Sequence, residues 1–586
     1  MAEQAAPISS GSYVRSPRHD IWRRLFGRDW KIAFVFIAPI VIVMGVFIAW
    51  PFIDAIYTSM TIRTMSRETR FVWFDNYIRL YNDPFYRQAV RNTLVFTSGA
   101  IFFKLVFGLI ASLLLHGLGR VRNLITGLVL LPWIIPSVVQ ALAWRSIYDP
   151  LFGGLNPILL NLGLIDRPLS WLADPKMAMA SVIAVNVWAG IPFFTVNILA
   201  GLSSIDQELY EAAEIDGANV WDKFLYITLP GLRYVIAVAT LLSTVWTFNN
   251  FETIFLLTSG GPAGATKVYS IMAYEKAIRS LQFGPGVAVA FSLTPVLAFF
   301  ILLLSRYMRR DVDRGELTGT WQDAVIDGVG RVIGFIGTVV SWPIMMILSG
   351  LKAIVPASFA GGPSRSRNNL IGAILRWIAL LILLAFILFP FYWIMITAFK
   401  SDLQIGAREN IFWPEPWTLM QFDRLFYDEP FFVWFGNSVL VSVSTTALAV
   451  VFAALGGYAL ARLRFRGAES MTTILLITYM LPGSLMFIPL YGILADLKVI
   501  NSLWALILTY PTNMVPFATW LLMGYYRSIP EDLEEAAMVD GANRLQAFIR
   551  VTLPLTAPAL LAVTLFCSPT PGRNSSSPSS SSPATS

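Results

Sequence analysis

The chain has 586 residues, of which 56% are hydrophobic and only 13% charged, and its formal net charge is +7. This composition, with a mean hydropathy of +0.63, excludes an ordinary soluble domain and indicates an integral membrane protein. The single cysteine, Cys567, excludes an internal disulfide, and two histidines leave little for a metal site. No basic stripe with interleaved aromatic residues lies outside the apolar runs, so the positive charge indicates membrane-surface polarity and no nucleic-acid partner.

The N-terminal segment, residues 1–31, carries six basic side chains immediately before the first apolar run. That run is long enough to cross a bilayer, whereas a cleavable signal peptide has a short apolar core. We therefore expect a retained membrane anchor. Because basic residues collect on the cytoplasmic side of membrane spans, we also expect a cytoplasmic N-terminus.

Apolar runs of about 20 residues recur along the chain and predict an all-α protein with two bundles of membrane helices. The first domain, 32–307, has expected spans at 32–53, 92–117, 123–144, 177–202, 234–257 and 287–305. The second domain, 373–566, has expected spans at 377–399, 436–461, 470–494 and 502–526, then a partial fifth at 555–566 that is too short to cross. Prolines near the middle of the third span of each domain predict bends there; they are Pro132, Pro136, Pro482 and Pro489.

The linker between the domains, 308–372, contains an uncharged stretch at 332–351. One crossing there would invert the second domain. We therefore expect this stretch to lie in the membrane interface or to enter the membrane and return. A topology reporter attached after Gly362 would give an external signal if this hypothesis were wrong.

One short polar segment occurs twice, each time after the fourth expected span of a domain. The first copy reads EAAEIDGANVWDKFLYITLP (211–230) and the second EAAMVDGANRLQAFIRVTLP (535–554), and eleven of twenty positions are identical. A second echo precedes the second span, where RLYNDPF (79–85) matches RLFYDEPF (424–431). The chain is therefore predicted to contain two related domains in parallel topology, with both copies facing the cytoplasm.

The residues of the repeated segment indicate docking and no catalytic role. Glu-Ala-Ala starts a helix well, and Gly217 or Gly541 can adopt the left-handed conformation that ends a short helix before a second one. Small alanines permit close approach to a groove on another protein, and acidic residues can pair with basic residues there. The ordinary alternative is a solvated helical hairpin, which two copies at matching positions make less attractive.

These segments resemble the EAA loops of importer permeases of the ATP-binding-cassette (ABC) superfamily. FDNYIRL (74–80) and WTFNNFETIFLLTSGGP (246–262) are similar to the sugar-uptake subgroup that includes maltose and glycerol-phosphate permeases. The resemblance implies a type I importer permease in the bacterial inner membrane, with two permease halves fused in one chain. It implies that the ATPase-coupling residues are Glu211, Ala212, Ala213, Asp216, Gly217, Ala218 and Pro230, with Glu535, Ala536, Ala537, Asp540, Gly541, Ala542 and Pro554.

The same resemblance implies two cytoplasmic ATPase subunits and an extracytoplasmic solute-binding protein as partners, and a small carbohydrate as substrate. The chain contains no GxxxxGK[ST] sequence, and SGGPAGATK (259–267) has the wrong spacing for a phosphate-binding loop. We therefore expect no catalytic residue and no cofactor in this chain, with ATP bound and hydrolysed by the partners. Met538 stands where the first copy has Glu214, so the two docking surfaces need not be equivalent.

A sugar path needs polar groups that match hydroxyls, together with aromatic faces. The candidates are Asn186, Trp188, Asn197, Trp246, Asn249, Asn250, Tyr510 and Asn513. Each has an ordinary alternative, because amides join membrane helices and tryptophans sit at interfaces. Lys104 is a charged residue inside an expected span and is therefore a functional candidate, although a structural pairing is favoured.

After residue 566 the sequence becomes a Ser/Pro-rich tail, 567–586, where the family would continue through a fifth and a sixth span. Two interpretations are open. A phenylalanine-rich coding run displaced by one nucleotide would give such serines, so the tail can be a frameshift product; it can also be a natural disordered segment. Resequencing the gene past this point separates them. With the tail as written, the second bundle is expected to be truncated.

Two other functions are weighed. An ion-coupled secondary transporter would need membrane-embedded carboxylates, and none lies in the middle of an expected span. A membrane scaffold that transports nothing is the second alternative, and it gains weight if the truncation is genuine.

Overall fold

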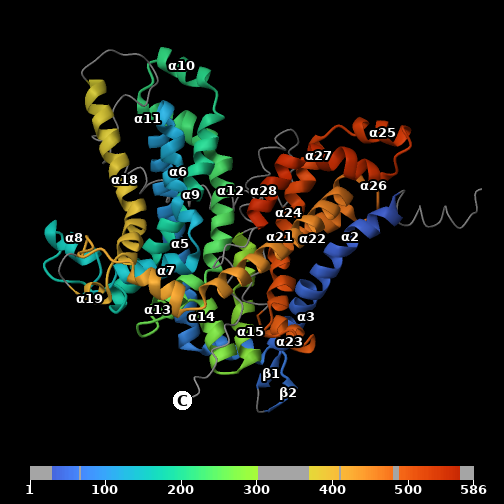
Figure 1. The fold of residues 1–586 in the computed structure, drawn as a ribbon, viewed down its shortest axis with the longest axis horizontal. Coiled ribbons are helices and arrows are strands. Elements are labelled where there is room, and N and C mark those ends of the chain that lie inside the picture. Colours follow the sequence, from blue (N-terminus) through green and yellow to red (C-terminus); the bar gives the residue numbers. More distant parts are fainter. Residues whose placement is uncertain (1–28, 65–66, 301–367, 408–410, 480–486, 568–586) are drawn as a thin grey trace, which may run out of the picture.

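The computed structural model describes residues 29–64, 67–300, 368–407, 411–479 and 487–567, and in this part the chain is helical apart from one strand pair (Figure 1). The all-α membrane fold predicted from the sequence is confirmed. Residues 1–28, the interdomain stretch 332–351, Pro482 and the tail from residue 568 lie outside the described residues.

The first domain contains most of the short elements. Its helices are α2 (Trp30–Met44), η1 (Gly45–Ala49), α3 (Trp50–Ser59), α4 (Asp75–Asn82), α5 (Pro84–His116), η2 (Gly119–Val121), α6 (Arg122–Ile134), α7 (Ser137–Ile147), α8 (Leu155–Asn161), α9 (Pro175–Ser203), α10 (Gln207–Ile215), α11 (Val220–Lys223), η3 (Phe224–Thr228), α12 (Leu229–Phe248), α13 (Glu252–Thr258), α14 (Tyr269–Tyr274), η4 (Glu275–Arg279) and α15 (Phe283–Ser292). Strands β1 (Thr61–Thr64) and β2 (Arg67–Phe71) pair antiparallel, with Thr61 opposite Phe71.

The second domain repeats the long elements of the first. Its helices are α18 (Asn368–Ala398), α19 (Asp402–Ile405), α20 (Met420–Asp423), η7 (Arg424–Asp428), α21 (Phe431–Arg462), α22 (Ala468–Tyr479), α23 (Phe487–Asp496), α24 (Leu503–Ser528), α25 (Asp532–Val539), α26 (Arg544–Ala547), η9 (Phe548–Thr552), α27 (Leu553–Leu555) and α28 (Ala557–Cys567).

Among the described residues, seven helices are long and apolar enough to cross a membrane, and two further pairs of helices pass the same test together. The seven match expected spans, although several begin earlier and one ends earlier than expected. For example, α5 begins at Pro84, eight residues before the expected start, because Asp83 accepts a hydrogen bond from Phe85 N (2.9 Å) and proline suits the first turn. Hydropathy therefore finds the membrane segment but misses its polar extension.

The third span of the first domain is sharply broken, as its prolines predict. Helices α6 and α7 meet at an angle of 93°, and Pro136 is the residue that precedes α7. Gln140 Nε2 bridges the break by donating to Pro132 O and Ile135 O, both at 2.8 Å. The proline ring prevents the regular helical hydrogen bond there, and the amide satisfies carbonyls that the break leaves open.

The C-terminal boundary of the expected fifth span, 234–257, is wrong, because the helix ends earlier. Helix α12 already ends at Phe248, and α13 begins only at Glu252. Asn249 caps α12, where its side chain donates to Val245 O at 3.0 Å. The apolar run continues through both helices, so hydropathy could not detect the break that the paired asparagines introduce.

The two domains exchange their first helices. Helix α2 packs into the core of the second domain, where Phe36 contacts Tyr458 and Phe548 at ring distances of 5.7 Å each. A Cβ on Gly456 would lie only 2.0 Å from Ile40 Cδ1, so the Ile40 side chain would have to shift to admit any larger residue at this helix contact. Conversely, α18 packs on α6 and α7 of the first domain, where Trp393 Nε1 donates to Ser146 Oγ at 3.0 Å. Each bundle is thus completed by a helix from the other half.

Candidate functional site

The first copy of the repeated segment folds as a helix, a tight turn and a second short helix. Asp206 begins α10 by accepting from Glu208 N at 3.1 Å. Gly217 ends it with a φ of +78°, and no atom would crowd a Cβ there, so the backbone conformation alone requires glycine. Asn219 Oδ1 then begins α11 by accepting from Trp221 N at 2.8 Å. The predicted left-handed glycine is confirmed.

The second copy has the same backbone hydrogen bonds. Ala542 N donates to Ala537 O at 3.0 Å, as Ala218 N does to Ala213 O at 2.9 Å. Gly541 has a φ of +94°. Asn543 and Gln546 form a reciprocal capping box at the start of α26, with bonds of 2.8 and 2.9 Å. The duplication read from the sequence is therefore a duplication of structure.

Both copies lie at one end of the molecule, and β1 and β2 lie at the other (Figure 1). The start of α2 is at the same end as the second copy, because Asp29 N donates to Arg464 O at 3.2 Å and Asp29 Oδ2 lies 3.8 Å from Arg544 Nη2. This arrangement agrees with the number of expected spans. Four spans precede the repeated segment in each domain, and an even number of crossings places the N-terminal segment and both copies on one side.

The exposed side of each copy combines acidic and apolar groups. Glu211, Asp216, Glu535 and Asp540 are all exposed. Sequence reasoning missed Ile215 and Val539, which precede the two aspartates and are 88% and 87% exposed. A β-branched apolar residue exposed at the same place in both copies suits a buried contact with a partner. Their matching positions in the repeat were the signal that could have revealed them.

The inner side of each copy is anchored differently. In the first copy, the hydroxyls of Tyr210 and Thr228 form a hydrogen bond of 2.9 Å. Lys223 Nζ also pairs with Glu214 Oε1 at 2.5 Å, which ties α11 to α10. The prediction that the two copies need not be equivalent concerned Met538, which replaces Glu214 and removes this pair from the second copy.

In the second copy, Glu534 occupies the place of Tyr210 and is only 2% exposed. Its carboxylate accepts hydrogen bonds from Tyr458 Oη (2.9 Å) and Thr552 Oγ1 (2.7 Å) and lies 3.4 Å from Arg462 Nε. Arg462, the last residue of α21, also donates to Ile529 O and lies 3.4 Å from Glu531. A buried charge is tolerated only when paired and hydrogen-bonded in this way. This network fixes α25 to α21.

The candidate path residues of the first domain do not converge on one cavity. Trp188 is buried and its Nε1 donates to Ile387 O of α18 at 3.1 Å, so it lies in a helix contact. Asn197 donates to Phe193 O at 2.7 Å within its own helix, and Asn249 Oδ1 accepts from Tyr269 Oη at 2.6 Å. Trp188 and Asn249 thus join helices, as membrane helices often require, whereas the bond of Asn197 stays within α9.

Four of the remaining candidates have either an exposed side chain or a buried oxygen without a partner among the described residues. Asn186 and Asn250 each have a buried Oδ1 with no hydrogen-bond partner in the described part of the chain. Trp246 is 41% exposed and packs edge-on against Phe193, with ring centroids 5.0 Å apart. In the second domain, Tyr510 is half-buried and Asn513 is exposed on α24.

Lys104 and Glu252 are two charged side chains within expected spans of the first domain. Lys104 is buried, its Nζ donates to Thr247 Oγ1 at 2.9 Å, and its stem fills the space beside Gly190. Glu252, which falls in an expected span and was overlooked, begins α13 and accepts a hydrogen bond from Ser137 Oγ of α7. It therefore joins the break between α6 and α7 to the break between α12 and α13. Sequence reasoning overlooked it because it lies near the end of its expected span.

A family model matches the chain twice and covers both repeated segments. The model describes a binding-protein-dependent transport system inner membrane component, and it matches residues 104–314 and 449–570. The chain belongs to this family of transport permeases. The two matches confirm the fused architecture, and the permease fold and the multi-pass inner-membrane location follow from membership.

Several curated permeases are similar to this one. The trehalose/maltose transport system permease protein MalF of Thermococcus litoralis is 33% identical over 288 residues, which are 49% of this chain and 97% of that protein. The lactose transport system permease protein LacF of Rhizobium radiobacter is 31% identical over 275 residues, 46% of this chain and 90% of that protein. Each relative thus matches about half of the fused permease over nearly its own whole length.

Solved structures are similar over a comparable share. One chain from the crystal structure of a bacterial ABC transporter involved in the import of the acidic polysaccharide alginate is 23% identical, with a TM-score of 0.44, and covers 50% of this chain and 99% of that chain. Another, from that transporter in complex with an alginate pentasaccharide-bound periplasmic protein, is also 23% identical and has the same TM-score, covering 51% of this chain and 99% of that chain.

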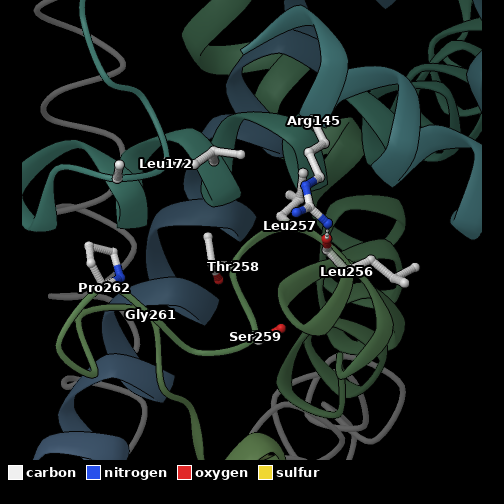
Figure 2. A pocket seen from close by; sticks show the side chains of 9 residues that line it. Arg145, Leu172, Leu256, Leu257, Thr258, Ser259, Gly261 and Pro262 are labelled. Atoms are coloured by element: carbon white, nitrogen blue, oxygen red, sulfur yellow. Dashed lines mark hydrogen bonds between the residues drawn. The ribbon is translucent and has the colours of Figure 1, made fainter. Parts of the chain in front are cut away.

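The permease has a cavity of about 330 Å³ beside the end of α13 (Figure 2). The loop after α13 forms one wall, and Arg145 reaches in from α7, where its Nη1 lies 3.5 Å from Leu256 O. The SGGPAGATK loop belongs to this wall and is held by Asn92, which donates to Gly264 O (2.9 Å) and Lys267 O (3.0 Å). None of the eight candidate path residues lines this cavity.

Proposed function

We propose that this permease forms the transmembrane path of an ATP-driven carbohydrate importer and works by alternating access. The observation that carries the proposal is the doubled helical loop, which has one hydrogen-bond pattern and an exposed apolar residue at the same place in each copy, both at one end of the molecule. Two docking elements of the same backbone shape on one side suit two copies of a cytoplasmic motor.

The partners follow from this arrangement. Two ABC ATPase subunits bind the loops, and ATP is bound and hydrolysed on those subunits, so that this chain itself holds no cofactor and catalyses no reaction. An extracytoplasmic solute-binding protein delivers the substrate to the opposite end, in keeping with the family description. The names of the relatives, which transport trehalose, maltose or lactose, support a small carbohydrate as substrate.

The orientation is set by the N-terminal segment. Its basic residues favour the cytoplasmic side, and the start of α2 contacts the second loop through Asp29 and Arg544. Both loops therefore face the cytoplasm. Asn186, Asn250, Trp246 and Asn513 keep groups available for a hydroxylated substrate when the bundles rearrange.

Affinity capture of the tagged full chain from its own membranes tests the docking. Glu211→Arg and Glu535→Arg reverse one exposed charge in each loop, and each should lower the recovery of a co-purifying ATPase by about tenfold or more, because a like charge then faces the basic partner residues. Asp166→Arg, at an exposed acidic position outside both repeated segments, is the matched control and should change nothing. Undiminished recovery with both loop variants would refute the coupling role.

Uptake measurements test the substrate class. Proteoliposomes that contain the chain, the captured ATPase and a solute-binding protein should accumulate radiolabelled trehalose, maltose or lactose only when ATP is inside with the ATPase. Accumulation driven by an ion gradient without ATP would contradict the proposal.

A further inference from the structure

A wide helical turn follows the second short helix of the repeated segment in both halves of the permease. It is η3 in the first half and η9 in the second, and each leads into the next helix of its bundle. In the first half, Leu229 N donates to Phe224 O, a bond that spans five residues where a regular α-helix spans four. Leu553 N makes the same bond to Phe548 O in the second half. Both halves thus have a π turn where the repeated segment joins the bundle.

The proline that follows each π turn explains its geometry. Pro230 comes two residues after η3, and Pro554 comes two residues after η9. A proline has no N–H, and its ring clashes with the carbonyl four residues earlier, so a regular α-helix is disfavoured at this point. Two other π turns, η1 and η7, also end two residues before a proline. The recurrence of this spacing indicates that the local sequence produces the turn.

The last residue of each π turn is a buried threonine that contacts the first helix of the repeated segment. Thr228 is 5% exposed, and its Oγ1 donates to Lys223 O at 3.3 Å. The same oxygen lies 2.9 Å from Tyr210 Oη and therefore accepts the hydrogen bond of that hydroxyl. Thr552 is fully buried, and its Oγ1 donates to Glu534 Oε1 at 2.7 Å. Both threonines thus join the start of a bundle helix directly to α10 or α25.

The two threonines are alike although their partners differ in chemistry. Tyr210 offers a hydroxyl donor, whereas Glu534, at the matching position of the second copy, offers a carboxylate acceptor. A threonine hydroxyl both donates and accepts, so the same residue suits both partners, and a valine of the same shape suits neither. The contact is therefore kept in both copies while the group on the other side changes.

Each contact bridges the place where the helix bends most easily. Helices bend at prolines and at π turns, so bending between the repeated segment and the bundle is expected at η3 and η9. Tyr210 and Glu534 lie before the turn, and the two threonines lie at its end. The hydrogen bond between them therefore opposes bending of the turn.

We propose that Thr228 and Thr552 are positioning residues that make each repeated segment and the following helix move together when an ATPase subunit displaces the segment. With the bond in place, a displacement of α10 or α25 reaches the bundle. With the bond broken, the π turn bends and the displacement is lost. This inference rests on the proposed function and deepens it, because it names contacts through which ATP hydrolysis is coupled to transport.

ATP hydrolysis and sugar uptake, measured in the same proteoliposomes, test this role because their ratio reports coupling. Thr228→Val and Thr552→Val each remove a hydroxyl and keep the shape of the side chain. The ATP hydrolysed per sugar taken up should rise about 2- to 10-fold in Thr228→Val. It should rise about 10-fold or more in Thr552→Val, because a hydrogen bond to a charged group is stronger. Recovery of the ATPase in affinity capture should be unchanged in both.

Further variants separate coupling from a general effect on the fold. Thr228→Ser and Thr552→Ser keep the hydroxyl and should have the ratio of the unmutated chain. Thr244→Val is the matched control, since the Thr244 hydroxyl donates to Thr240 O within α12, and it should leave the ratio unchanged. Tyr210→Phe removes the same bond as Thr228→Val from the other side. The double variant should therefore be no more uncoupled than either single variant.

An unchanged ratio in both valine variants would overturn the role of the threonines and leave the importer function standing. Loss of ATPase capture in the valine variants, or serine variants as uncoupled as the valine ones, would overturn it too, since the threonines would then act through the fold of the segment. If Thr228→Val does not elute as a single species in size-exclusion chromatography, Tyr210→Phe replaces it. Absence of ATP-driven uptake by the unmutated chain would refute the importer function, and this role with it, before any variant is compared.

Discussion

The buried charge network in the second copy of the repeated segment predicts that Arg462→Met will strongly destabilise the packing of α25 against α21. Arg462 Nε and Glu534 Oε1 lie 3.4 Å apart, and both side chains are almost fully buried. At an effective dielectric constant of about 20, their attraction is about 5 kcal/mol. Methionine keeps the volume of the arginine stem but leaves the Glu534 carboxylate with only two neutral donors. Removing one partner of a buried pair costs about 3–5 kcal/mol.

The effect should appear as local opening of the loop, because α25 is fixed to α21 mainly through this network. Hydrogen exchange followed by mass spectrometry on peptides covering 532–547 should accelerate by about 10²- to 10⁴-fold, as that free energy implies. Peptides covering 207–223, from the first loop, serve as the internal reference and should not change. Tyr210→Phe is the matched control, since it removes one neutral hydrogen bond worth about 0.5–1.5 kcal/mol from the first loop.

The double variant Arg462→Met, Glu534→Leu separates the charge from the packing. With both ions gone and similar volumes in place, exchange should return close to that of the unmutated chain. Exchange of 532–547 that is unaffected by Arg462→Met alone would show that the network does not hold the loop, and the reasoning from buried charge would be wrong.

Three further predictions concern the loops and the external side. Ile215→Ser and Val539→Ser should each weaken ATPase binding by about 10- to 100-fold in a titration with the purified subunit. The reason is that burying such a side chain in the contact is worth about 1.5–3 kcal/mol. If the variants bind the ATPase as tightly as the unmutated chain does, these residues do not contact it. Gly541→Ala should cost about 1–2 kcal/mol through its φ of +94°, seen as faster exchange of the second loop, and an unaltered rate would contradict the conformational argument. Hydrogen bonding to the Arg424 guanidinium lowers the pKa of Asp402, so this contact stabilises the packing of η7 against α19 at pH values above the ordinary carboxyl range. Its contribution is lost as the pH falls through the lowered value. Exchange of peptides around residues 400–424 should therefore rise in acid in the unmutated chain and show little pH response in Asp402→Asn, whereas equal responses would refute the linkage.

Some features could be predicted because they depend on short segments. Pro136 breaks a span through its own ring, and Gly541 ends a helix through its own backbone, so neither needs knowledge of a distant partner. The repeat itself required only a comparison of the chain with itself. The membrane helices were found for the same reason, since hydropathy is a local sum over about 20 residues.

Other features could not be predicted because they depend on contacts between distant segments. Glu534 looked like one more surface acid of a polar loop, and only the fold brings Arg462 to it from the end of α21. Trp188 looked like a candidate for sugar stacking, but its indole N–H is used by α18, a helix from the other half. The exchange of first helices, which has no local signal, is what places that partner there.

The two copies of the repeated segment therefore share a backbone shape but differ in the helices that they contact. In the first loop, the Lys223–Glu214 pair joins α11 to α10, both within the loop. A displacement of α10 is therefore transmitted to the bundle mainly along the helix that continues from α11 into α12. In the second loop, Glu534 is joined to α21 through Arg462, and Arg544 lies beside Asp29 at the start of α2. Because α2 belongs to the first half in sequence, displacement of the second loop should be transmitted to spans of both halves. Equal movements of two identical ATPase subunits should then move the two bundles unequally. Because both halves are fused in one chain, each loop always belongs to the same bundle, and this inequality is the same in every molecule.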